Sequence, residues 1–87
     1  MSNHLSVRIY PNKQVVCNVV AEEDLDNHIE YNKTFRFGCL LYIDGTRVSD
    51  GCLKQEVLSD YDTFYKDWYS RIRVNVNLNK VTRPVYL

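Results

Sequence analysis

The cysteines and histidines are the residues of this chain best suited to metal binding or nucleophilic chemistry. Cys17, Cys39 and Cys52 form no Cys-x-x-Cys pair, and His4 and His28 are distant from them in the sequence. A structural zinc site is typically marked by closely spaced ligand pairs, and a nucleophilic cysteine needs a histidine within reach. We therefore predict no metal and no cofactor, and we expect Cys17 and Cys39 to be buried as small apolar side chains.

The carboxylates and glycines give no catalytic pattern. Asp60 and Asp62 are two residues apart, a spacing that turns them to different sides of a helix. Asp44 and Asp50 each precede a glycine, as residues of turns commonly do. The chain has three glycines and no glycine-rich loop that could cradle a phosphate. We interpret the protein as non-enzymatic.

Length and composition predict one small domain. The chain has 87 residues, of which 45% are hydrophobic, with eleven basic and eleven acidic side chains. This balance argues against an acidic DNA mimic and against a protein that coats nucleic acid through overall charge. The first residues lack the pattern of a signal peptide, no apolar run has the length of a membrane helix, and three cysteines cannot all pair with one another. We expect a cytoplasmic protein that does not bind membranes.

Charge is unevenly distributed along the chain. The segment 22–30 is acidic, and the C-terminal segment 71–83 is basic. The two segments form either ordinary solvated faces or a dipolar surface that orients a partner. The acidic residues are Glu22, Glu23, Asp24, Asp26 and Glu30, and the basic ones are Arg71, Arg73, Lys80 and Arg83.

Alternating apolar residues predict strands over residues 5–10, 14–20, 33–43, 46–49 and 71–81. The Pro11-Asn12-Lys13 segment is typical of a turn. Asp44-Gly45 supplies the two positive-φ residues of a tight hairpin.

The segment 54–72 is the best candidate for a helix, because its apolar and aromatic residues recur at intervals of three and four. Ser59 with Asp62 resembles a capping box, so the helix has an alternative start at Ser59. We expect Trp68 to be buried against the sheet. Residues 21–32 are compatible with a short helix over 21–31 or with a long loop.

These elements predict an α+β fold. It would be a mostly antiparallel sheet of four or five strands, with the aromatic-rich helix (about 57–72) packed across one face.

The sheet face opposite that helix is the predicted working surface. A sheet with a helix on one side leaves its other face to water or to a partner, and arginine and tyrosine are common anchors of interfaces. We expect the contact residues to be Arg8, Tyr10, Arg36, Tyr42 and Arg73, with Tyr65 and Tyr69 on the helix edge as further candidates.

The leading hypothesis is a binding protein that modulates or inhibits a larger protein or a protein–nucleic acid complex. The chain has eight asparagines, seven tyrosines and one alanine, a bias that small phage and viral accessory proteins share with proteins of AT-rich genomes. The alternative is a nucleic-acid-binding module that stacks bases on the Arg/Tyr/Asn sheet face.

Overall fold

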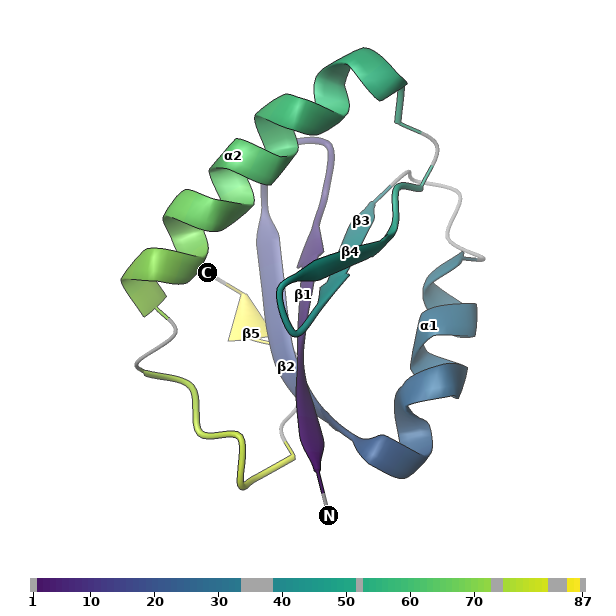
Figure 1. Ribbon diagram of the computed structural model, residues 1–87, viewed down its shortest axis with the longest axis vertical. Coiled ribbons are helices and arrows are strands. Elements are labelled where there is room, and N and C mark those ends of the chain that lie inside the picture. Colours follow the sequence, from purple (N-terminus) through teal and green to yellow (C-terminus); the bar gives the residue numbers. More distant parts are fainter. Residues whose placement is uncertain (1, 34–38, 52, 73–74, 82–84, 87) are drawn as a thin grey trace.

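The computed structural model describes residues 2–33, 39–51, 53–72, 75–81 and 85–86 (Figure 1). It confirms the α+β class, with one antiparallel sheet of order β4-β3-β1-β2-β5 and two helices. The strands are β1 (Asn3–Ile9), β2 (Val15–Ala21), β3 (Leu40–Ile43), β4 (Thr46–Ser49) and β5 (Val85–Tyr86). The helices are α1 (Leu25–Lys33), which follows a short 3-10 turn η1 (Glu22–Asp24), and α2 (Gln55–Ile72).

The sheet lies between the two helices, with α2 on one side and α1 on the other (Figure 1). Successive side chains of β1 point to opposite faces. Those of Leu5, Val7 and Ile9 pack in the core with α2. Those of Ser6 and Arg8 instead form hydrogen bonds to α1. The expectation that one sheet face remains open is therefore wrong, because the possible helix in the segment 21–31 exists, as η1 and α1 (Leu25–Lys33), and α1 covers part of this face.

Both predicted hairpin turns are confirmed. Lys13 has a φ of 66°, and the Tyr10 N–H donates to the Gln14 carbonyl at 2.9 Å, which closes the turn between β1 and β2. Asp44 and Gly45 have φ values of 51° and 90°, so both corners of the β3–β4 turn are left-handed, as a type I′ turn requires.

Helix α2 packs its aromatic residues against the sheet, as expected. Trp68 is 9% exposed and belongs to the core. Tyr65 stacks on Tyr42 of β3, with ring centroids 4.0 Å apart and an interplanar angle of 1°. The alternative start at Ser59 is wrong, because the helix begins at Gln55.

Residues 33–43 and 71–81 differ from the strands expected there. Lys33 ends α1, and the described strand begins at Leu40, with residues 34–38 outside the described part. Arg71 is still in α2, and residues 75–81 run in turns. The Asn77 side chain accepts the Asn79 N–H at 3.0 Å, a local bond that competes with sheet pairing. The last strand is β5, two residues that pair with β2.

Cys17 and Cys39 are buried, as the sequence predicts. Cys17 is 6% and Cys39 is 2% exposed, and both are free thiols. Burial raises the pKa of Cys17 to about 11, so its thiol stays protonated and unreactive at neutral pH. Cys52 lies outside the described residues.

We predict that Trp68→Ala destabilises the protein by about 3–5 kcal/mol, because it removes a large buried side chain and leaves a cavity. This loss is comparable to the whole stability of a small domain. Thermal unfolding followed by circular dichroism measures it. Leu78→Ala is the control, since Leu78 is 45% exposed and its truncation opens no cavity. A cooperative Trp68→Ala melt close to that of the wild type would contradict the prediction.

Candidate binding groove

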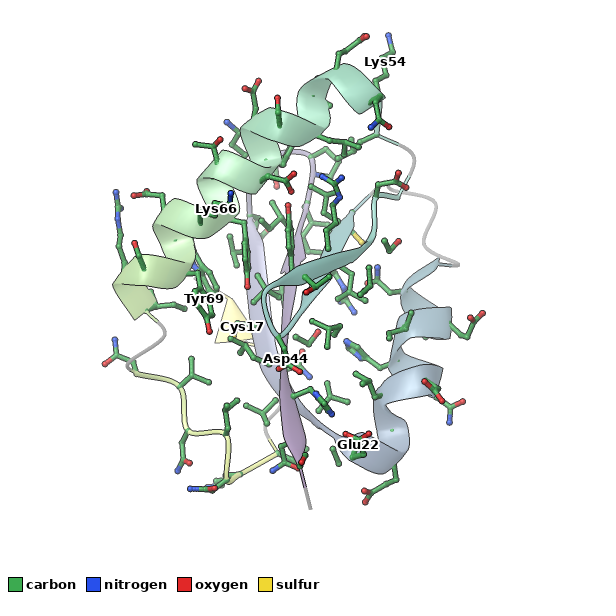
Figure 2. The ribbon with its side chains drawn as sticks, viewed as in Figure 1. Cys17, Glu22, Asp44, Lys54, Lys66 and Tyr69 are labelled. Carbon is green, nitrogen blue, oxygen red and sulfur yellow. The ribbon has the colours of Figure 1, made fainter. Side chains whose placement is uncertain are left out.

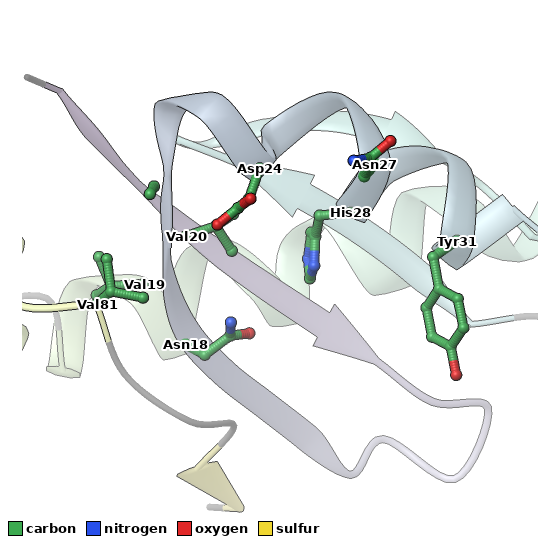
Figure 3. A pocket seen from close by; sticks show the side chains of 9 residues that line it. Asn18, Val19, Val20, Asp24, Asn27, His28, Tyr31 and Val81 are labelled. Atoms are coloured by element: carbon green, nitrogen blue, oxygen red, sulfur yellow. The ribbon is translucent and has the colours of Figure 1, made fainter.

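A groove of about 380 Å³ lies between α1 and β2. Its helical wall comes from η1 and α1, its floor from β2, and Val81 of the segment that follows α2 closes one end (Figure 3). Figure 3 shows Tyr31 at the opposite end from Val81, with the His28 and Asn18 side chains between them.

The spacing of residues in each element explains why these side chains meet. Asp24, Asn27, His28 and Tyr31 follow one another at the three- and four-residue intervals that place side chains on one side of a helix. Asn18 has the position in β2 whose side chain points toward α1, because it pairs with Ser6 of β1. The groove thus brings together one polar side of η1 and α1 and the part of β2 around Asn18.

His28 anchors the helical wall to the sheet. Its Nε2 lies 2.6 Å from the Ser6 hydroxyl. Burial lowers the pKa of His28, and the nearby Arg8 charge lowers it further, so the ring is neutral at physiological pH. Ser6 is only 1% exposed, so the pair holds α1 in place and offers no nucleophile to the groove.

A second polar contact fixes the far end of α1. The Arg8 Nε donates to the Asn32 side-chain oxygen at 2.7 Å, and the Cys39 thiol donates weakly to the same oxygen at 3.8 Å. Asn32 is 2% exposed. These bonds satisfy the buried Asn32 side-chain oxygen, whereas the buried Asn32 Nδ2 has no hydrogen-bond partner among the described residues.

The ends of the groove expose large side chains. Tyr31 is 61% exposed and Val81 is 52% exposed. Tyrosine is enriched at protein interfaces because it combines a large apolar area with a hydroxyl at low entropic cost. The two ends therefore provide contact area beyond the groove itself.

The helical wall is strongly acidic. No lysine or arginine occurs from residue 14 to residue 32, and the sequence of η1 and α1 contains one basic residue, Lys33 at the end of α1, against five acidic ones. The acidic side chains are Glu22, Glu23, Asp24, Asp26 and Glu30.

His4 connects this wall to the rest of the sheet. Its two ring nitrogens contact the carboxylates of Asp44 and Glu22. Asp44 also accepts the Leu5 N–H at 3.0 Å. Hydrogen bonds to Asp44 and then to Glu22 raise the pKa of His4 above its ordinary value of 6.5. We call these three side chains the His4 clasp, which joins β1, η1 and the β3–β4 hairpin.

Those residues of the predicted working surface that the structure describes do not gather on one exposed face. Tyr42 is 2% and Tyr65 is 4% exposed, so the expectation that Tyr42 is exposed is wrong, and Tyr65 is not at an accessible helix edge. Tyr69 is half-buried and packs against the core. Arg8 lies half-buried beneath α1, and Tyr10 is half-buried at the end of β1.

Two reasons explain the difference for Tyr42. The pairing of β1 with β3 places Tyr42 opposite Val7, and therefore on the face covered by α2. Its hydroxyl reaches Asp62 of α2 at 2.6 Å. The remaining two predicted residues, Arg36 and Arg73, lie outside the described part of the chain.

Sequence reasoning did not identify the groove residues Asn18, Asn27, His28 and Tyr31. The available signal was the spacing of the polar residues from Asp24 to Tyr31, which matches one helical stripe. This spacing predicts a shared face only if the segment is helical, and the sequence is also compatible with a loop over residues 21–32.

Comparisons with known proteins identify no relative. No protein-family model, no curated protein and no solved structure matches this chain. Within the described residues, no group of three or more histidine, cysteine or acidic side chains is arranged to hold a metal ion. Neither described helix has the length and apolar character needed to cross a bilayer.

We predict that His4→Gln lowers the melting temperature at about pH 5.5 and has less effect at about pH 8.5. The carboxylates raise the pKa of His4 in the folded state, so the stabilisation is complete below the unfolded pKa of about 6.5 and is lost as pH rises through the folded pKa.

The other histidine, His28, also titrates, so its effect on stability must be separated from that of His4. His28, whose pKa is lowered, has the opposite effect, because its stabilisation is lost as pH falls below its unfolded pKa. Since His28 is present in both proteins, the difference between wild type and His4→Gln isolates His4. A difference that stays constant across this pH range would show that the His4 clasp does not contribute through charge.

Proposed function

We propose that this protein is a small, non-enzymatic binding module that modulates or inhibits a larger protein. In this proposal the groove between α1 and β2 is the contact surface, and the partner inserts a basic side chain into it. The observation that carries the proposal is a groove that is lined by Asp24, within the acidic stretch of η1 and α1, and that has the exposed side chains of Tyr31 and Val81 at its ends.

Size and chemistry favour a protein segment as the occupant. A volume of about 380 Å³ accommodates one or two side chains, and an interface extends around such a pocket over the neighbouring surface. Tyr31 and Val81 would supply the apolar part of that surface, and the acidic residues of η1 and α1 would attract lysine or arginine.

The same features weigh against the nucleic-acid alternative. Acidic side chains repel phosphates, which dominate the affinity for nucleic acids. Arg8, which was expected to contact them from the open sheet face, is directed to Asn32 beneath α1.

The biased composition supports the more specific proposal of a phage or viral accessory protein that acts on host machinery. Eight asparagines and seven tyrosines against one alanine are typical of an AT-rich source. An inhibitor of this size acts by occupying a surface, and such action needs no catalytic group.

The test is affinity capture from lysate of the native host, with mass spectrometry of the bound proteins. We predict that the wild-type protein captures a partner from the lysate. The double variant Tyr31→Ala/Val81→Ser should bind this partner with an affinity at least tenfold weaker than that of the wild type. Tyr31 and Val81 supply the apolar contact area of the proposed interface, and a combined loss of about 1.4 kcal/mol corresponds to the tenfold threshold.

Val48→Ala is the matched control, because Val48 is 36% exposed on β4 and does not line the groove. All three proteins should melt at similar temperatures, since every altered side chain is at the surface. Equal capture by the wild type and the groove variant would place the contact surface elsewhere. Capture of nucleic acid that is abolished by added salt would favour the alternative function.

A further inference from the structure

A second pocket, of about 350 Å³, lies on the opposite side of the sheet from the groove. It is formed by the β3–β4 hairpin and the middle of α2, with side chains from Tyr42, Thr46, Arg47, Asp62, Tyr65 and Lys66. Its volume is at the lower end of the range found for small-molecule sites.

The charges in this pocket do not cancel. Asp62 accepts hydrogen bonds from the Tyr42 hydroxyl at 2.6 Å and from Arg47 Nη1 at 2.8 Å, so its negative charge is balanced by Arg47. Lys66 forms no ion pair or hydrogen bond with any other described residue. The pocket therefore carries one positive charge in excess.

Hydrogen-bond donors are also in excess. Arg47 has five N–H donors, and its recorded ion pair with Asp62 runs through Nη1 alone. Tyr65 forms part of the pocket wall, and its buried hydroxyl has no hydrogen-bond partner among the described residues. Burial raises the pKa of Tyr65 to about 12, so this hydroxyl remains a donor at neutral pH.

The nearby acidic groups do not remove this excess. Asp44 adjoins the pocket residue Gly45, but its carboxylate is held by His4 and the Leu5 N–H. The uncompensated Lys66 charge and the remaining Arg47 N–H groups thus share one pocket, in which the Asp62 carboxylate is already bonded to Tyr42 and Arg47.

We propose that this pocket binds a small oxyanion of the phosphate or carboxylate type. Lys66 and the free N–H groups of Arg47 would hold its charge, because charge-assisted hydrogen bonds from such groups to oxyanions are strong. Asp62 would keep the Arg47 guanidinium in place. This site is separate from the groove on the α1 side and does not depend on the function proposed for that groove.

The test is a titration of the whole protein with inorganic phosphate and, separately, with acetate, at constant ionic strength maintained with sodium chloride. Amide chemical shifts report the site. We expect saturable shifts at Thr46 and Lys66, with a dissociation constant on the order of millimolar, as is typical of a few charge-assisted contacts in a partly open pocket. The tighter of the two probes identifies the class of oxyanion.

Lys66→Gln connects binding to the pocket. It should weaken binding about fivefold, the upper range for an exposed charge pair.

Lys54→Gln is the matched control. Lys54 immediately precedes α2, far from Lys66 in the middle of the helix (Figure 2), and does not line the pocket. The proposal is supported if Lys66→Gln weakens binding and Lys54→Gln does not. It is overturned if neither probe gives a saturable shift up to about 50 mM, well above the expected millimolar range, or if the two lysine variants behave alike.

Discussion

The burial of both faces of the central strand β1 is the constraint on which the rest of the structure depends. β1 pairs with β2 on one side and with β3 on the other. One face carries Val7 and Ile9, both 0% exposed, against α2. The other face carries Ser6 and Arg8, which need polar partners once they are covered. α1 supplies these partners, so its position is determined by hydrogen bonds as much as by apolar contacts.

This placement of α1 explains why the groove exists. His28 and Asn32 hold the helix over β1. On the α1-facing side of β2, Val16 and Val20 are buried, whereas Asn18 between them is only partly covered. Asn18 is half-buried at the floor of the resulting groove. Of the acidic side chains of η1 and α1, Asp24 lines the groove, whereas Glu22 is held by His4 of β1. One structural requirement thus shapes both the core and the candidate surface.

Local patterns were sufficient to predict the turns, the paired strands β1 and β2 and the aromatic helix α2. Asp44-Gly45 and Pro11-Asn12-Lys13 act through backbone preferences that do not depend on the rest of the fold. The error over Tyr42 has a different origin. Alternation in a strand separates residues into two sets, but it does not say which set faces which helix, or whether the second face is covered. Leu40, Leu41, Tyr42 and Ile43 are all buried, so β3 has no solvent-facing set at all. The groove was missed for the same reason, because it depends on where α1 docks.

The pairing of β5 with β2 has a consequence for how the chain reaches this fold. Ile9 and Val15 of the first hairpin are six positions apart, whereas Val16 and Tyr86 are 70 positions apart. Closing the longer loop costs more chain entropy, and the pairing that results stabilises the fold through only two residue pairs between the described parts of β2 and β5. We therefore expect β5 to join the sheet late in folding and to leave it early in unfolding. During that interval the outer edge of β2 is open to strands from other molecules, which makes the order of assembly a determinant of aggregation.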